Sequence, residues 1–408
     1  MSKDILKVSK EIKKEAKEQL ARIKRGCSEI IPEKELLSKI EKSLVNKKPL
    51  RVKFGADPSR PDLHLGHAVV LQKLKVFQDL GHHIFFLIGD FTAQIGDPTG
   101  KNETRPTLSK DEVKRNAQSY AEQVFKILNR NTTQVVFNSQ WTDTLKINDI
   151  IKLASQVTVA QILERDDFSK RYKGGQPISV HEFLYPIAQA YDSVQLHADV
   201  ELGGTDQKFN LLLGRDFQKN AGQSPQAVVM TPLLVGLDGS QKMSKSLNNA
   251  ISFEDKANDF FGKIMSISDD SMYHYYELLT EEDLKVTKEL HPKEAKMQLA
   301  TILIERFFDK DNAQKARAEF EAVFSKKALP KDIPLVTTAH AQIALTKAMS
   351  EHKLCPSLSE ARRLIVQGAV QVNNKKITDT THTITDLKEA IIKVGKRRYL
   401  KIKFNVQG

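Results

Sequence analysis

Short apolar runs alternate with helix-length stretches between residues 51 and 138. The runs are RVKFGA (51–56), IFFLIGD (84–90) and QVVFN (134–138), and the stretches between them have the residue pattern of helices, over about 62–80 and 110–128. Strands separated by helices of this length predict a parallel sheet covered on both faces. We therefore expect an α/β fold with a doubly wound parallel sheet, in which ligands bind beyond the carboxyl ends of the strands.

The rest of the chain divides by composition and periodicity. Apolar residues recur every three or four positions from Ile5 to Ile23, which predicts a helix, and a Lys/Pro-rich stretch, SKKALPKDIP, is typical of a linker. The predicted divisions are an N-terminal helical extension (1–45), the doubly wound domain (46–250), a helical domain (251–330), a linker region (331–354) and a small basic α+β domain (355–408).

The positive charge of the chain is concentrated at its two ends. The net charge is +12, from 63 Lys/Arg and 51 Asp/Glu. Residues 1–50 hold 14 basic and 8 acidic side chains, and residues 356–408 hold 11 and 4, so the segment between them has a net charge of −1. Basic ends on a near-neutral body favour a polyanionic partner such as a nucleic acid, with solubilising charge as the alternative.

Composition also bears on the compartment. The chain has only two cysteines, Cys27 and Cys355, so neither a disulfide framework nor a four-thiolate zinc site is expected. The first residues, MSKDILKVSKEIKK, have no apolar signal-peptide core, and no apolar run reaches the roughly 18 residues of a membrane span. We expect a cytoplasmic protein without a membrane partner.

The first motif, DPSRPDLHLGH (57–67), lies where a predicted strand gives way to a helix. His64 and His67 are three residues apart, so they share a face of the first helical turn, where unpaired backbone amides point outward. Gly66 allows a ligand to approach the backbone closely. The pattern predicts an anion site. The alternative is a capped helix with surface histidines; a metal site is less favoured, because no third ligand accompanies the pair.

The second motif, IGDPTGKNETR (95–105), superficially resembles a P-loop. A P-loop requires Gly at the position of Ile95 and Ser or Thr at the position of Asn102, so that interpretation fails. What remains is a loop that carries one carboxylate, Asp97, and two cations, Lys101 and Arg105. An ordinary turn is the alternative.

The third motif combines YPIAQAYD (185–192) with ELGGTDQ (201–207). On a helix, Tyr185, Gln189 and Asp192 project a hydroxyl, an amide and a carboxylate from one stripe. Such a stripe can line a small polar pocket, although a solvated helix face is the alternative. The Gly203–Gly204 pair allows close backbone approach to a ligand, and a plain turn explains it equally well.

The fourth motif, LDGSQKMSKSLNNAI (237–251), is the most specific string of the four. Lys242 and Lys245 lie in a loop of small polar residues. Two ammonium groups on such a loop are suited to clamp a polyphosphate during a reaction and to release it afterwards.

Taken together, HLGH near the first strand and KMSKS far downstream resemble the class I aminoacyl-tRNA synthetases. The intervening GDPTGK, YPxxQAYD and GGTDQ narrow the resemblance to the bacterial tyrosyl-tRNA synthetase family. It runs from about residue 50 to the C-terminus. The segment PSLSEARRLIVQGAVQVNNKKI (356–377) is similar to the S4-type RNA-binding domain that ends such enzymes, and the resemblance makes the doubly wound domain a Rossmann-like catalytic domain.

The resemblance implies ATP-dependent ligation of L-tyrosine to tRNA(Tyr) through tyrosyl-adenylate, with release of pyrophosphate. It further implies a homodimer and Mg²⁺ that accompanies ATP, with no tightly bound metal. The residues implied for ATP are Asp57, His64, Gly66, His67, Gly204, Asp206, Lys242 and Lys245. Those implied for tyrosine are Asp97, Tyr185, Gln189, Asp192 and Gln207, with Asp192 on the phenolic hydroxyl.

The resemblance also implies that catalysis depends on cations and imidazoles around the phosphates, namely His64, His67, Lys101, Arg105, Lys242 and Lys245. RNA contact is expected from the basic residues of the last domain, namely Arg362, Arg363, Lys375, Lys376, Lys396, Arg397 and Arg398. For residues 1–45 we favour a brace on the catalytic domain over direct contact with tRNA.

One residue departs from the family pattern. Members often have a tyrosine four residues before the aspartate of the DP pair, as a second partner for the substrate hydroxyl, whereas this chain has Lys53. Either Lys53 replaces that contact, Asp192 acts without it, or the local register differs. The alternative functions are a tryptophanyl-tRNA synthetase and an RNA-binding protein on a synthetase scaffold. A generic dinucleotide enzyme is disfavoured, because no GxGxxG follows the first strand.

Overall fold

The computed structural model describes residues 9–59, 61–98, 109–325, 333–338, 342–385, 389–395 and 398–404. The contacts divide the chain into two compact units, residues 1–320 and 321–408. Among the described residues, no helix combines the length and apolar character that crossing a membrane requires.

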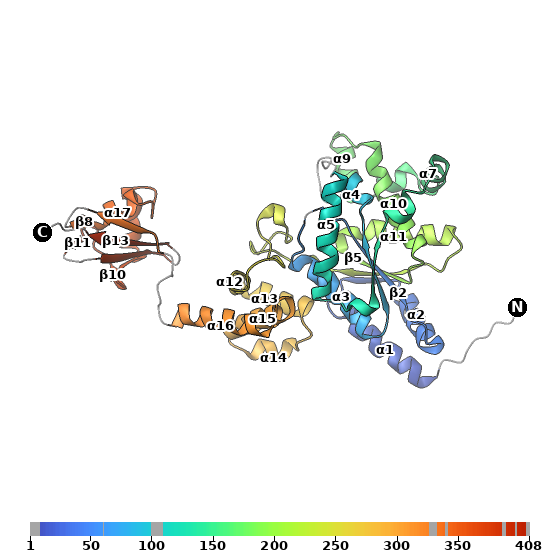
Figure 1. Cartoon of the computed structure of the whole chain (residues 1–408), viewed down its shortest axis with the longest axis horizontal. Helices are drawn as coiled ribbons and strands as arrows, with labels where there is room; N and C mark the ends of the chain where they lie inside the picture. Colours follow the sequence, from blue (N-terminus) through green and yellow to red (C-terminus); the bar gives the residue numbers. More distant parts are fainter. Residues whose placement is uncertain are drawn as a thin grey trace. The chain divides into compact units, whose positions relative to one another are not determined.

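The first unit is built on a six-stranded sheet with the order β1-β6-β5-β2-β3-β4 (Figure 1). The strands are β1 (Glu29–Ile31), β2 (Arg51–Ala56), β3 (His83–Ile88), β4 (Thr133–Phe137), β5 (Val200–Gly204) and β6 (Ala227–Thr231). Strands β2 to β6 are parallel, and β1 pairs antiparallel with β6 at one edge. The chain runs outward from β2 to β4 and then restarts at β5 on the other side of β2. The doubly wound prediction is confirmed, with its switch point between β2 and β5.

Helices cover both faces of this sheet. Helix α3 (Leu65–Asp79) packs on one face, and α10 (Leu184–Gln195) and α11 (Lys208–Asn220) pack together on the side of the sheet where α11 contacts β5 and β6. In β3, Phe86 belongs to the main core cluster, whereas its neighbours Phe85 and Leu87 belong to a separate cluster on the opposite side. Both faces of the strand are therefore apolar, as a parallel sheet requires.

The remaining helices of this unit flank the sheet or follow it. Those before α10 are α1 (Lys10–Lys24), α2 (Glu33–Asn46), α4 (Thr92–Ile95), α5 (Lys110–Gln123), α6 (Ser139–Thr142), α7 (Ile147–Ala154), α8 (Val159–Ile162) and α9 (Asp166–Lys173). Those after the sheet are α12 (Ala257–Ser266), α13 (Asp269–Leu279), α14 (Leu284–Glu289), α15 (Pro292–Phe307) and α16 (Lys310–Ser325), in the range expected to be helical.

The N-terminal segment contains a strand that the helical prediction missed. Strand β1 lies between α1 and α2 and joins the sheet through β6. A three-residue edge strand has no readable period, and its pairing partner lies about two hundred residues away, so its formation depends on tertiary contact.

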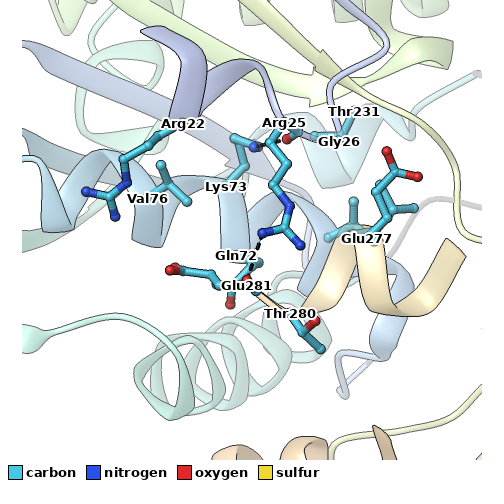
Figure 2. A pocket seen from close by; sticks show the side chains of 12 residues that line it. Arg22, Arg25, Gly26, Gln72, Lys73, Val76, Thr231, Glu277, Thr280 and Glu281 are labelled. Carbon is cyan, nitrogen blue, oxygen red and sulfur yellow. Dashed lines mark hydrogen bonds between the residues drawn. The ribbon is translucent and has the colours of Figure 1, made fainter. Parts of the chain in front are cut away.

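The end of α1 is also attached to the helical part of the unit. Arg25 donates to the carbonyls of Glu281 and Glu282, at 2.8 and 2.6 Å, and Lys73 of α3 donates to the carbonyl of Arg25. These groups surround a small cavity of about 80 Å³ (Figure 2). The contacts support the interpretation of this segment as a brace.

The second unit has a five-stranded sheet of order β10-β9-β12-β13-β7 and a two-stranded sheet of β11 and β8. Its elements are β7 (Leu335–Thr338), β8 (Gln342–Ala344), α17 (Leu345–Glu351), α18 (Leu358–Val366), β9 (Val370–Val372), β10 (Lys375–Ile377), β11 (Thr383–Thr385), β12 (Glu389–Val394) and β13 (Arg398–Phe404). The range 331–354, expected to be a linker, therefore carries structure: β7 pairs with β13 and β8 with β11. The Lys/Pro signal precedes these elements, and both strands are too short to show alternation.

Helix α18 presents the basic residues that the sequence pointed to. Ser357 caps the helix by accepting from the Glu360 amide, and Ala361 and Ile365 are fully buried. Among the basic residues predicted to contact RNA, Arg362, Arg363, Lys375, Lys376 and Arg398 are exposed. Lys396 and Arg397 lie outside the described residues.

Candidate active site

A cavity of about 1110 Å³ opens at the carboxyl ends of the parallel strands, at the switch point between β2 and β5. Every described residue that the sequence assigned to ATP or tyrosine lines it. These are Asp57, His64, Gly66, His67, Asp97, Tyr185, Gln189, Asp192, Gly204, Asp206, Gln207, Lys242 and Lys245. Lys101 and Arg105 lie outside the described residues. Residues from distant parts of the sequence therefore share one cleft, at the place where a doubly wound sheet binds its ligands.

The two histidines form the start of α3. His64 is the N-cap, and its Nδ1 accepts from the Gly66 amide at 3.1 Å. The Nδ1 of His67 accepts from the His64 amide at 3.2 Å, and the ring centroids are 4.0 Å apart. Because both Nδ1 atoms are acceptors, each neutral ring carries its hydrogen on Nε2.

Burial keeps both rings neutral. Desolvation, with the nearby positive charge of Lys245, lowers the pKa of His64 to about 2 and that of His67 to about 4. At neutral pH the pair therefore offers two Nε2–H donors and no net charge. Donors of this kind, fixed at a helix N-terminus, are suited to phosphate oxygens.

The absence of a side chain at residue 66 is required by this arrangement. A Cβ on Gly66 would lie 2.8 Å from Cε1 and 2.9 Å from Nδ1 of His64. We expect Gly66→Ala to push the His64 ring out of its cap position and to slow ATP-dependent pyrophosphate exchange by at least about tenfold, since one placed donor is worth about 2–4 kcal/mol. The control is Gly262→Ala in α12, where a Cβ meets nothing within 4 Å. Equal exchange rates for the two variants would contradict this role.

The loop that carries Lys242 and Lys245, called the lysine loop below, is anchored at its base. The Asn249 side chain accepts from the Ser244 amide at 2.7 Å and donates to the carbonyl of Lys242 at 3.1 Å. The Tyr275 hydroxyl donates to the carbonyl of Val235 at 2.7 Å. The backbone on both sides of the two lysines is thereby held.

The two lysine ammonium groups pair with carboxylates from different elements that line the cavity. The Lys242 Nζ lies 3.5 Å from the Asp206 carboxylate, which follows β5. Lys245 pairs with Asp62, which precedes α3. Both pairs are partly exposed, so a triphosphate can exchange for these carboxylates at little cost.

Polar side chains at the inner end of the cleft hold one another. Asp57 accepts from the Tyr185 hydroxyl at 2.9 Å and from the Thr92 hydroxyl at 2.7 Å. Asp97 accepts from Gln207 at 3.0 Å and from Arg165 at 3.0 Å. The pKa of Tyr185 is raised well above its usual value by burial and by the two carboxylates, so its hydroxyl stays protonated. The stripe predicted from YPIAQAYD thus forms part of a polar pocket.

Asp192 lies at the bottom of this pocket with 1% exposure. It accepts from the Trp141 indole at 2.8 Å and from the Asn138 amide at 3.3 Å. Burial raises the pKa of Asp192 to about 7, against the opposing effects of Lys53 and of these two donors. A buried carboxyl group with this pKa changes its charge near neutral pH, so its strength as an acceptor for one further hydroxyl depends on pH.

Sequence reasoning missed several residues that hold the site. Asn138 directly follows β4, so the rule that ligands gather at the carboxyl ends of strands could have found it. Arg165 and Asn210 carry no local signal. They are nevertheless buried, and Asn210 accepts from Arg165 at 3.1 Å and donates to Gln189 at 2.9 Å.

Comparison with known proteins agrees with this geometry. Residues 45–325 match the family model described as "tRNA synthetases class I (W and Y)", and residues 325–402 match the "Tyrosine–tRNA ligase SYY-like C-terminal domain". The first model spans tryptophan and tyrosine enzymes together, and the second is specific to tyrosine. The chain belongs to the tyrosine–tRNA ligase family.

Relatives and solved structures support the same assignment. The tyrosine–tRNA ligase of Carboxydothermus hydrogenoformans is 53% identical over 96% of this chain and 98% of that protein, and that of Francisella tularensis is 52% identical over 95% and 98%. The tyrosyl-tRNA synthetase of Archaeoglobus fulgidus, solved with L-tyrosine, matches with a TM-score of 0.61 and 25% identity, over 74% of this chain and 99% of that one. Members of this family are ATP-dependent class I ligases. Neither of the two alternatives, a tryptophanyl-tRNA synthetase and an RNA-binding protein on a synthetase scaffold, is supported.

Proposed function

We propose that this chain ligates L-tyrosine to tRNA(Tyr) in two steps, with the roles of its residues as follows. The tyrosine carboxylate attacks the α-phosphorus of ATP to form tyrosyl-adenylate and pyrophosphate, and a terminal ribose hydroxyl of the tRNA then takes the tyrosyl group. The observation that carries the proposal is the shared cavity, in which the histidine pair and the lysine loop adjoin a polar pocket that ends in Asp192.

The first step asks the protein for alignment and charge stabilisation. The attacking carboxylate is already anionic, and pyrophosphate is a good leaving group once its charge is neutralised, so no covalent enzyme intermediate is needed. His64 and His67 would donate Nε2–H to the phosphates as neutral groups. Lys242 and Lys245, with Lys101 and Arg105, would neutralise the pyrophosphate. Gly66, Gly204, Asp57 and Asp206 would adjoin the nucleotide.

The polar pocket would bind the amino acid at its two ends. The carboxylate of Asp97, the hydroxyl oxygen of Tyr185 and the side chain of Gln189 would receive the tyrosine ammonium, and Gln207 would lie along the amino acid or ribose side. The Tyr185 hydroxyl, which donates to Asp57, still has lone pairs for this purpose. Asp192 would accept from the phenolic hydroxyl, a group that phenylalanine lacks.

Mg²⁺ is proposed to enter with ATP. A small, hard cation that gives up water reluctantly is held mainly by phosphate oxygens and water at such sites. The residues assigned to the phosphates here are cations and neutral donors, and this set complements a metal that the nucleotide itself carries.

The second unit would contact the tRNA. Exposed Arg362 and Arg363 on α18, Lys375 and Lys376 on β10, and Arg398 on β13 present positive charge to phosphates, together with Lys396 and Arg397 from the sequence. Affinity for tRNA should fall steeply as the salt concentration rises.

A homodimer is also proposed. Ile147, Ile150 and Ile151 are 75%, 38% and 60% exposed, and their spacing places them on one face of α7. Three exposed isoleucines on a short helix favour cover by a second copy of the chain. We expect sedimentation velocity to give a dimer, and Ile147→Asp with Ile151→Asp to weaken it. Val286→Asp, at a residue 60% exposed on α14, is the control.

The experiment that tests the activity is amino-acid-dependent exchange between ATP and labelled pyrophosphate, run with each of the twenty amino acids. Exchange supported by tyrosine and by no other amino acid is the expected result. Exchange that depends on tryptophan, or none with any amino acid while the folded protein binds RNA, would overturn the proposal.

A further inference from the structure

A lysine and a glutamate form a fully buried pair directly behind the tyrosine pocket. Lys53 of β2 and Glu201 of β5 are register partners on the two strands that flank the switch point. Both side chains are 1% exposed, and the Lys53 Nζ lies 2.9 Å from Oε1 of Glu201. Parallel-sheet positions such as these are normally apolar.

The ammonium of Lys53 is engaged by three groups of the protein itself. Besides its ion pair with Glu201, its ammonium donates to the carbonyl of Gln189 at 3.1 Å and to the hydroxyl of Ser193 at 2.8 Å. Two of the three N–H groups donate these hydrogen bonds, and the ammonium faces Oε1 of Glu201 as an ion pair. A direct contact between Lys53 and the phenolic hydroxyl, one of the three alternatives left open by the sequence, is therefore not favoured.

Glu201 is also held by hydrogen bonds. Its Oε2 accepts from the Ser193 hydroxyl at 2.9 Å and from the amide of Gln226, which precedes β6. A buried ion pair seldom adds net stability over an apolar pair of the same volume, because both charges must be desolvated. The pair therefore calls for an explanation other than stability.

The position of the pair next to Asp192 provides this explanation. Gln189 and Ser193, which both contact Lys53, flank Asp192 on α10. Lys53 and Asp192 both line the cavity. The Lys53 ammonium thus lies near the Asp192 carboxyl group, which is proposed to accept from the tyrosine hydroxyl.

We infer that Lys53 is a positioning residue for tyrosine recognition: its ammonium, held in place by Glu201 and Ser193, favours the anionic form of Asp192, which accepts the phenolic hydrogen. The inference rests on the proposed role of Asp192. It assigns to a sheet position, without contact to substrate, a share in the choice of tyrosine over phenylalanine.

Several other charged groups near α10 have partners of their own, and Asp57 accepts from the Tyr185 hydroxyl. On α11, Arg215 pairs with Glu35; on the 3₁₀ turn before α10, Glu182 pairs with Arg171; on α7, Asp149 caps its own helix. Helix α4 carries no titratable side chain, and Asp90 and Asp97 beside it accept from Ser139 and Arg165. The charges that act on the pKa of Asp192 are Lys53, which lowers it, and Glu201, which raises it.

The experiment measures the affinities for L-tyrosine and L-phenylalanine by equilibrium dialysis without ATP, from about pH 5 to about pH 9. The ratio of the two affinities isolates the hydroxyl contact, because both amino acids share the ammonium and carboxylate. In the unmodified protein the preference for tyrosine should fall as the pH drops through the pKa of Asp192, because the protonated acid loses the charge-assisted hydrogen bond.

Three variants give an ordered set of outcomes. Glu201→Gln should move the midpoint of this loss to lower pH, because it removes the negative charge and leaves Lys53. Lys53→Met should move it to higher pH. The double variant, which removes both charges of the pair, should lie between the unmodified protein and Lys53→Met, since Lys53 has the larger effect on Asp192.

The outcomes separate this inference from the proposed function. If Asp192→Asn leaves the tyrosine preference unchanged, the proposed role of Asp192 fails. If Asp192→Asn abolishes the preference but the three pair variants share one midpoint with the unmodified protein, the role of Lys53 fails alone. If the pair were purely structural, the variants would lose thermal stability and overall affinity, but the pH midpoint of the loss of tyrosine preference would not move. Because the double variant removes both charges of the pair, it remains informative if Lys53→Met does not fold.

Discussion

Lys245→Ala and Lys242→Ala will each slow tyrosyl-adenylate formation by about 30- to 1,000-fold and leave tyrosine affinity nearly unchanged. The range corresponds to the loss of one charged contact to the transition state, about 2–4 kcal/mol. Both lysines lie on the loop that follows β6, whereas the contacts proposed for tyrosine come from α10, from Asp97 after α4 and from Gln207 after β5. A group that acts mainly on developing negative charge changes the rate and not the affinity for the amino acid.

Of the two lysines, Lys245 is expected to have the larger effect. Its side chain is 24% exposed against 48% for Lys242, and its charge contributes to lowering the pKa of both histidines. A less hydrated ammonium that lies near the proposed phosphate donors stabilises charge more strongly. The order of the two effects is therefore part of the prediction.

Rapid-quench measurement of the first turnover, beside equilibrium tyrosine binding, checks both quantities. Lys285→Ala, an exposed lysine on α14, is the matched control and should behave as the unmodified protein. If the loop variants lose tyrosine affinity in proportion to any loss of rate, the lysines belong to amino acid binding and the assignment is wrong.

The sequence predicted the parts of the fold that are built from long periodic elements. The three strands 51–56, 84–90 and 134–138 correspond to β2, β3 and β4 within two residues, because a buried parallel strand is apolar on both faces and is followed by a readable helix.

The sequence did not predict elements whose stability is entirely tertiary. Strands β1 and β7 have three and four residues and exist because β6 and β13 offer a free edge to pair with. No local pattern encodes such pairing, which is why the first was expected as helix and the second as linker.

The same limit applies to the site. Residues in dense motifs were found and line one cavity, whereas the groups that hold them were not. Trp141 is the clearest example, since a single tryptophan in a polar stretch gives no hint that its indole donates to a carboxylate fifty residues later. Lys53 was noticed only through its departure from the family pattern, and its partner Glu201 was quoted as the first residue of ELGGTDQ without a role.

The second large effect concerns Asp192→Asn, which should reduce the preference for tyrosine over phenylalanine by about 10- to 100-fold. A hydrogen bond from the phenol to a buried carboxylate is worth about 1.5–3 kcal/mol, and a neutral amide replaces it only in part. Competitive pyrophosphate exchange with the two amino acids gives the ratio directly. Asp143→Asn, an exposed aspartate after α6, is the control.

The same substitution should stabilise the free protein above neutral pH. The pKa of Asp192 is about 7 in the folded chain, against about 3.9 for an unfolded aspartate, so its ionisation opposes folding as the pH rises between these values. Three pKa units correspond to about 4 kcal/mol at pH 8, and to much less at about pH 5, where the group is protonated in the fold. The midpoint of thermal unfolding of Asp192→Asn should therefore exceed that of the unmodified protein at pH 8, with a smaller difference at pH 5. A variant that keeps its tyrosine preference, or that is less stable at pH 8 than at pH 5 relative to the unmodified protein, would show that Asp192 is not the strained acceptor described here. If both effects occur together, one buried carboxylate lowers the stability of the free protein and in return provides its selectivity.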